Sequence, residues 1–244
     1  MSVDNKNEYG VNSIDFYKDF MNKRDKGNYE IDGAINIEKW KSNEHKILFV
    51  LKETAGYQNC PVFYLRDELK DTWLQYKQKR GNQYIQAPTY KNISLLAKSL
   101  QIAFNRNKVL TTSEISKIST KPDILFDAIE NCAIINVKKH SNTKGKSDDK
   151  NIYSEFIENK ELLEWQIADL SPNIIFAGSS VCWKCLSDKK NGLYKDIIIT
   201  SLEKNGCKTF NGIIFYHANH PSAYGKHRMN IPNIHKQIFM EVNR

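Results

Sequence analysis

Near the C-terminus, several polar side chains that could act on a ligand follow one strand-like run. Ile213–Asn230 reads IIFYHANHPSAYGKHRMN, in which an apolar run is followed by His217, Asn219, His220 and Ser222. A strand that only completes a core usually closes on Gly, Asn or Asp, whereas side chains presented at a strand end are well placed for binding or catalysis. An imidazole there could donate a hydrogen bond to negative charge that develops on a substrate. We interpret His217, on the opposite side of the strand, as structural, and His220 as the candidate.

Possible partners for His220 follow the other apolar runs of the sequence. Glu53 follows ILFVL in the stretch KETAGY, and Asn136 ends the run CAIIN. A third run leads into AGSSVCW, a small-residue turn that opens a helix, where Ser179 and backbone amides could face an anion. A carboxylate, an amide and a histidine in one place could position water and stabilise a developing anion. The AGSSV turn lacks the second Gly of a G-x-S-x-G elbow, which argues against a serine hydrolase.

The elements that must position these side chains are four apolar runs of strand length. The runs are Lys46–Leu51, Cys132–Val137, Asn173–Gly178 and Gly212–His217. They are almost continuously apolar rather than alternating, which is typical of strands covered on both faces.

Helical patterns separate these strands, as in residues 92–105 and 153–170, and a closing helix is expected at 231–242. We therefore expect an α/β fold: a three-layer αβα sandwich with a central, mainly parallel four-stranded sheet. Ligands bind such sheets at the C-terminal ends of the strands.

Length and composition indicate one cytoplasmic globular domain. We expect a single domain over residues 1–244, with a helical N-terminal extension to about residue 45 and an insertion at about 57–92. No run has the roughly 18 consecutive apolar residues of a membrane helix, and the polar N-terminus carries no apolar signal core. We expect a monomer that does not associate with a membrane.

The net charge of +8 makes DNA or a nucleotide a plausible partner, although a Lys-rich and Asn-rich composition could equally reflect the genome. Of the five cysteines, only Cys182 and Cys185 have metal-like spacing, and no second Cys or His pair accompanies them. We expect reduced, buried thiols, and neither a metal nor a cofactor.

Four motifs, in order along residues 45–242, resemble the uracil-DNA glycosylase superfamily. They are ILFVLKETAG, AIINVKKHS, LSPNIIFAGSSV and HANHPSAYG. Members of that family carry a GEAPG-like or GQDPY-like turn after the first strand, an Asn at the end of the second and an H-P-S motif after the fourth. The resemblance implies the family's fold and a DNA-repair hydrolase that needs no metal or cofactor. Such an enzyme cleaves the N-glycosidic bond of a uracil or damaged base flipped out of DNA.

The resemblance implies two catalytic residues and one residue that reads the base. Glu53 falls on the glutamate of the GEAPG-like turn, and His220 on the histidine that donates to a base carbonyl as negative charge builds. Asn136 falls on the Asn whose amide pairs with the polar edge of the base. A flipped base also needs an aromatic partner for stacking. Candidates for this role follow the first motif: Tyr57, Phe63 and Tyr64.

Basic and small residues around these motifs are candidate DNA contacts. Tyr224 is the bulky residue of the loop that enters the duplex in the family, and Lys226 and Arg228 would bind phosphates there. The further candidates for contacts with DNA are Lys138, Lys139, Ser179 and Ser222.

The first motif departs from the family pattern at three positions. Thr54 stands where the GQDPY branch has a catalytic Asp, Ala55 replaces Pro, and Lys52 replaces a Gly. An alternative to the enzyme is therefore a catalytically diverged member that binds nucleic acid or a nucleotide. A small-molecule hydrolase with a closed pocket is a third possibility. Glu53 could also serve only to pair with Lys52 or Lys138.

Overall fold

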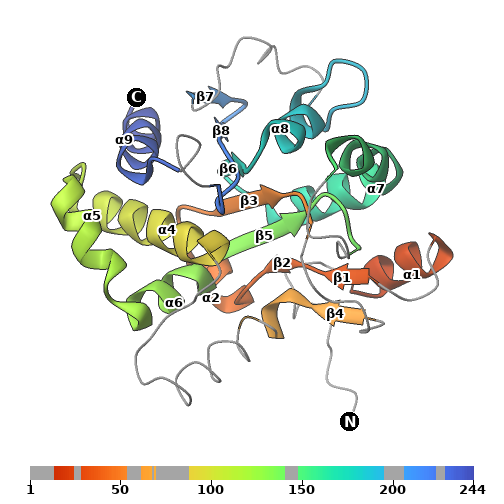
Figure 1. Cartoon of the computed structure of the whole chain (residues 1–244), viewed down its shortest axis with the longest axis horizontal. Coiled ribbons are helices and arrows are strands. Elements are labelled where there is room, and N and C mark those ends of the chain that lie inside the picture. Colours follow the sequence, from red (N-terminus) through yellow and green to blue (C-terminus); the bar gives the residue numbers. More distant parts are fainter. Residues whose placement is uncertain are drawn as a thin grey trace.

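A computed structural model describes residues 14–24, 29–53, 62–67, 69, 88–140, 148–194, 206–223 and 229–244. Within these residues the chain forms an α/β fold around one six-stranded sheet (Figure 1). The strand order in the sheet is β2 (Gly33–Ala34), β5 (Cys132–Asn136), β3 (Ile47–Leu51), β6 (Ile174–Ala177), β8 (Ile213–His217) and β7 (Gly206–Phe210).

The four strands expected from the apolar runs form the parallel centre of this sheet. β5, β3, β6 and β8 pair in parallel, while β2 and β7 pair antiparallel at the two edges. The α/β class is therefore confirmed, but the sheet is mixed and larger than the four strands expected. The edge strands were missed because β2 has only two residues and β7, with the sequence GCKTF, is partly exposed and has no apolar run.

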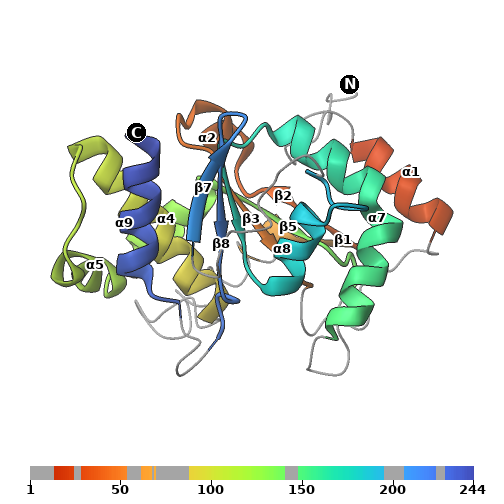
Figure 2. The same ribbon diagram turned by 90° about the horizontal axis from the view of Figure 1, so that it is seen from above.

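Helices cover both faces of the sheet, which explains why its central strands are apolar throughout. Every residue of β3, β5 and β6 is buried. Phe49 packs on one face with α4 (Pro88–Arg106), α5 (Thr112–Ser119), α6 (Pro122–Glu130) and α9 (Ile231–Val242). Leu48 and Val50 pack on the other face with α7 (Asp149–Leu170) and α8 (Ser180–Ser187). Figure 2 shows α4 and α9 on one side of the sheet and α7 and α8 on the other.

Local signals set the helix boundaries. Thr111 and Glu114 form a capping box at the start of α5, and proline lies in the first turn of α6 and of α9. Ser171 caps the C-terminus of helix α7. Its φ of 45° lies in the left-handed region, and Pro172 follows it. The helix expected at 153–170 thus begins four residues earlier than expected, at Asp149, because Asp148 caps it.

The N-terminal segment is more than a helix packed on the outside. Helix α1 (Ile14–Arg24) is followed by β1 (Tyr29–Ile31), which pairs in parallel with β4 (Val62–Tyr64), and then by β2 in the main sheet. Tyr17, Met21 and Tyr29 form a small buried cluster with Leu162 of α7. A short helix α2 (Ile37–Ser42) then buries Trp40, whose indole N–H donates to the carbonyl of Leu170 at 3.2 Å. In the described part of the chain, no helix has the length and apolar character needed to cross a bilayer.

Candidate functional site

The C-terminal ends of the four parallel strands bring the candidate residues to one edge of the sheet. In the strand register, Asn136 at the end of β5 lies opposite Leu51 of β3, and His217 at the end of β8 lies opposite Ala177 of β6. The pairing of β3 and β5 continues past the strands, because the Lys138 amide donates to the Lys52 carbonyl at 2.9 Å. The strand ends that the sequence predicted to meet at one edge of the sheet therefore do so.

Close packing holds the H-P-S turn against this edge. A Cβ atom on Gly178 would lie 2.7 Å from Leu51 Cδ2 and 3.3 Å from Pro221 Cδ, so any larger residue here would force Leu51 to move and would press on the turn. On the other side, the Asn92 amide of α4 donates to the Pro221 carbonyl at 2.6 Å. The turn that carries His220 thus extends from the end of β8 back over the ends of β6 and β3.

Hydrogen bonds within the turn determine which ring nitrogen of His220 carries the proton. The backbone N–H of Ser222 donates to His220 Nδ1 at 3.2 Å, and the Ser222 hydroxyl lies 2.7 Å from the same atom. Because a backbone N–H can only donate, Nδ1 must accept, and the proton of the neutral ring is on Nε2. Ser222, a candidate DNA contact, therefore orients His220.

His220 is neutral at physiological pH. Burial lowers its pKa to about 4, and the nearby positive charge of Lys52 acts in the same direction. The ring consequently presents Nε2–H as an uncharged donor. Its site also contains the Lys52 ammonium, at the position where the resemblance would place a glycine.

Acidification should destabilise the folded protein through His220. The pKa of about 4 in the folded state is below the ordinary value of 6.5, so the unfolded chain binds more protons between these two values. The contribution of the neutral His220 ring to the free energy of unfolding is complete above pH 6.5. It is lost as the pH falls through the pKa of the folded state. The loss is on the order of 3 kcal/mol, at 1.36 kcal/mol for each pKa unit. Urea unfolding of the wild type and His220→Asn from pH 7 to pH 4 tests this, and parallel stability profiles would contradict it.

The Glu53 carboxylate lies in the same region but is almost enclosed. Its side chain is 4% exposed, and Glu53 Oε2 lies 3.5 Å from Lys138 Nζ, whose side chain is 12% exposed. Lys52 Nζ forms a separate ion pair with Asp149 Oδ1 of α7 at 2.6 Å. Glu53 thus pairs with Lys138, which is one of the two partners expected if Glu53 has a structural role. Lys138 orients this carboxylate.

Asn136 belongs to a buried polar network with the N-terminal segment. Its side-chain amide donates to Glu30 Oε1 at 2.9 Å, and its backbone N–H donates to Asp32 Oδ2 at 2.6 Å. Asp32 also accepts from Lys139 Nζ at 2.8 and 2.9 Å and from the Gln166 amide at 2.9 Å. Each of these side chains is at most 3% exposed. The residue expected to read a base is therefore held by an internal carboxylate.

The prediction that Lys139 contacts DNA is wrong. Its side chain is fully buried, and its ammonium is bound to both oxygens of Asp32 and lies 5.6 Å from the centre of the Tyr17 ring. Moving this charge to the surface would leave Asp32 buried without its counter-ion. The partners Glu30, Asp32 and Gln166 were missed because each lies far along the chain and none belongs to a recognisable motif.

Two further candidates occupy structural positions. Ser179 is 6% exposed, and its hydroxyl accepts from the Cys182 amide at 3.1 Å as the N-cap of α8. Tyr64 is on β4 and packs against the cluster of Tyr17 and Tyr29, and this two-stranded sheet lies away from β8 (Figure 1). The structure therefore does not bring Tyr64 to the H-P-S turn.

Other candidate residues lie outside what the structure describes. This holds for Tyr57, Tyr224, Lys226 and Arg228, for Thr54 and Ala55, for the side chain of Phe63 and for most of residues 57–92. Their roles remain predictions from the sequence.

The remaining histidine and cysteine side chains near this edge are structural. His217 is buried and stacks on Trp183, with ring centres 5.1 Å apart and planes 11° apart. Cys182 and Cys185 are buried, and burial raises the pKa of Cys182 to about 12 and that of Cys185 further still. Among the described residues, no group of three or more His, Cys, Asp or Glu side chains could hold a metal ion.

A well-formed cavity of about 390 Å³ lies at the opposite edge of the sheet, where β3 and β5 begin. Its lining includes Ile47 and Cys132 at the strand starts and the rings of His45 and Phe104, whose centres lie 3.8 Å apart with planes tilted by 33°. It contains no residue of the H-P-S turn or of the segment after β3. We therefore assign the candidate site from the strand ends and not from this cavity.

No protein-family model matches the sequence, and no curated protein matches it as a relative. The candidate site therefore depends on its own geometry. That geometry comprises an uncharged imidazole donor, an enclosed carboxylate oriented by a lysine, and a lysine ammonium near the imidazole. Such a set can stabilise an anionic leaving group and position a water molecule.

Proposed function

We propose that this protein is a uracil-DNA glycosylase-like hydrolase, with the corresponding three-layer fold, that cleaves the N-glycosidic bond of a flipped uracil or damaged base. The observation that carries the proposal is His220, a neutral imidazole whose Nε2–H donor is set by two contacts with Ser222. A leaving base gains negative charge as its bond to the sugar breaks, so a fixed donor at this point lowers the barrier.

In the proposed reaction, the bond between sugar C1′ and the base nitrogen breaks while water attacks C1′. Nε2–H of His220 donates to a carbonyl of the departing base, and Lys52 adds positive charge nearby. Glu53, oriented by Lys138 Nζ at 3.5 Å, stabilises the cationic sugar and takes the proton that the attacking water loses. The base leaves as its anion and takes a proton from solvent water, Glu53 returns its proton to solvent, and the products are an abasic sugar and the free base.

A second candidate function is a catalytically diverged protein that binds nucleic acid or a nucleotide. The Asn136–Glu30 hydrogen bond favours it, because the amide donor that would read a base carbonyl is already bound to a carboxylate. The almost complete enclosure of the Glu53 side chain also favours the diverged binding protein. This function would give salt-dependent binding without a product.

An assay of base release separates the two functions. The protein is incubated in excess with single-stranded and double-stranded oligonucleotides that contain one uracil, and abasic sites are revealed by alkaline cleavage. We expect cleavage at the uracil and none in a matched oligonucleotide with thymine. Salt-dependent binding of the same DNA without abasic product, by a protein that is folded by circular dichroism, would favour the diverged binding protein.

A further inference from the structure

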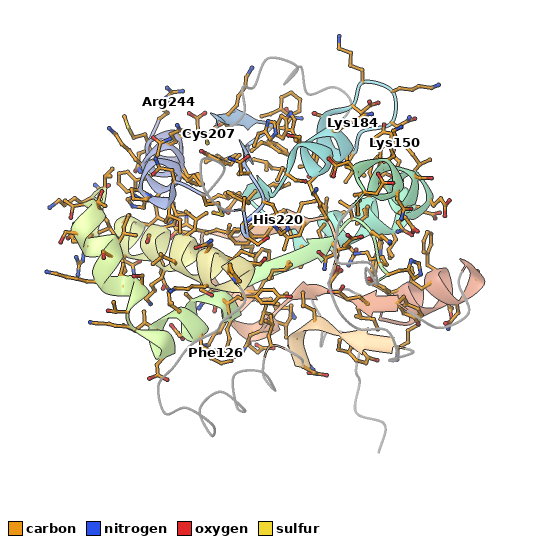
Figure 3. All side chains as sticks on the ribbon, in the orientation of Figure 1. Phe126, Lys150, Lys184, Cys207, His220 and Arg244 are labelled. Atoms are coloured by element: carbon orange, nitrogen blue, oxygen red, sulfur yellow. The ribbon has the colours of Figure 1, made fainter. Side chains whose placement is uncertain are left out.

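A second cavity lies between α7 and α8, beside the candidate site. Its volume is about 400 Å³, and it is lined by Asp149, Lys150, Tyr153, Ser180, Val181 and Lys184. Lys150 comes from the first turn of α7 and Lys184 from α8, and Figure 3 labels the two side chains near each other on these helices. Both residues are exposed, so their ammonium groups are accessible.

One ion pair connects this cavity to the strand ends. Lys52 follows β3, and its Nζ lies 2.6 Å from Oδ1 of Asp149 in the cavity wall. Ser180 and Val181 in the cavity wall follow Gly178, which packs against Pro221 of the H-P-S turn, so the cavity lies at the same edge of the sheet as the proposed reaction centre. A polymer held at His220 could therefore continue into the cavity.

The acidic groups around the cavity already have partners. Asp149 is paired with Lys52, and Asp148 accepts from the Lys150 amide at 3.0 Å. The carboxylate of Asp188, which lies near Lys184, accepts from the backbone N–H groups of Lys190 and Asn191 at 2.9 Å each. By contrast, neither Lys150 nor Lys184 forms an ion pair within the described part of the chain.

Tyr153 gives the cavity an aromatic wall beside these cations. Lys184 Nζ lies 4.0 Å from the centre of the Tyr153 ring, a cation–π distance that holds the ammonium at the cavity surface. The ring is only partly buried, and it also packs on Phe156 with centres 5.6 Å apart. Lysines beside an aromatic face form the arrangement that binds the phosphates and the sugars or bases of a single nucleic-acid strand.

We propose that Lys150, Lys184 and Tyr153 form a binding site for the backbone of a nucleic-acid strand, holding a phosphate next to the nucleotide at His220. The position of this strand relative to His220 rests on the proposed function. The proposal makes the substrate a polynucleotide rather than a free nucleoside, because part of its binding energy comes from a neighbouring phosphate.

The test is the salt dependence of binding to a single-stranded oligonucleotide without uracil, measured by fluorescence anisotropy. Lys150→Gln with Lys184→Gln removes two charges from the cavity. The matched control, Lys117→Gln with Lys236→Gln, removes two exposed charges from α5 and α9 on the other side of the sheet. The cavity variant should bind about tenfold more weakly and lower the slope of log K against log salt by roughly 1 to 2, since each phosphate contact contributes about 0.7 to 0.9. The control should bind like the wild type.

The outcomes separate this proposal from the proposed function. If the wild type releases uracil but both double variants bind DNA equally well, the cavity site is wrong and the glycosylase remains. If only the cavity variant loses binding and the wild type releases no base, the cavity site is supported and the glycosylase is wrong. If free phosphate at the assay ionic strength competes as well as the oligonucleotide, the cavity binds a small anion and the strand proposal is overturned.

Discussion

Replacing His220 by alanine will lower the rate of uracil release by about 10²-fold to 10³-fold, the usual cost of removing one donor to a developing anion. Affinity for uracil-containing DNA will stay close to that of the wild type, because the donor acts mainly on charge that appears during bond cleavage. Single-turnover rates and anisotropy measured on the same oligonucleotide provide the two readouts.

Ser222→Ala is the matched control for this prediction. The variant loses the hydroxyl at 2.7 Å from His220 Nδ1 but keeps the backbone N–H that donates to the same atom at 3.2 Å. The proton therefore remains on Nε2, and the rate should fall much less than in His220→Ala. Equal rates for wild type and His220→Ala would remove this residue from the mechanism, and equal losses in the two variants would show that the hydroxyl itself is required.

Replacing Asp32 by asparagine will destabilise the fold by about 3 to 5 kcal/mol, because Lys139 is then left as a buried cation without its bidentate partner. A protein of this type has about 5 to 15 kcal/mol of stability in total, so the variant will be partly unfolded in some conditions. Urea denaturation followed by tryptophan fluorescence measures the change.

Two further variants make this result interpretable. Lys39→Ala removes a half-exposed ion pair with Asp127 and Glu130 and should cost less than about 1 kcal/mol. Asp32→Leu with Lys139→Met removes the unpaired buried charge but leaves the Asn136 N–H and the Gln166 amide without their acceptor, so it should recover only part of the stability lost in Asp32→Asn. If Asp32→Asn costs no more than Lys39→Ala, the buried pair does not hold the N-terminal segment on the sheet.

The buried network also has a consequence for function. Glu30 of β1 and Asp32, which lies between β1 and β2, link this segment to Asn136 at the end of β5. The same residues thus stabilise the fold and determine the hydrogen bonding of Asn136. Any ligand that uses the Asn136 amide must compete with the Glu30 carboxylate, and this competition is the main structural argument for the diverged binding protein.

By itself, the sequence determined the central strands and the edge at which the candidate site lies. Apolar runs such as ILFVL and CAIIN predict buried strands because their burial depends on local composition, and parallel strands must present their C-terminal ends together. His220, followed by Pro221 and Ser222, was placed correctly at this edge for the same reason. Short or partly exposed edge strands such as β2 and β7 carry no such local signal.

Only the tertiary structure decided what the charged residues do. Lys138 and Lys139 are adjacent in the sequence, yet their partners differ. Lys138 pairs with Glu53 near the site, whereas Lys139 is buried in the core with Asp32, which is 107 residues away in the sequence. Likewise, the lowered pKa of His220 depends on burial and on the charge of Lys52, which follows β3. Burial and long-range pairing of a charge depend on which distant segments pack around it. The sequence therefore offered Lys52 and Lys138 as alternative partners of Glu53, but it could not decide between them or place Lys139 in the core.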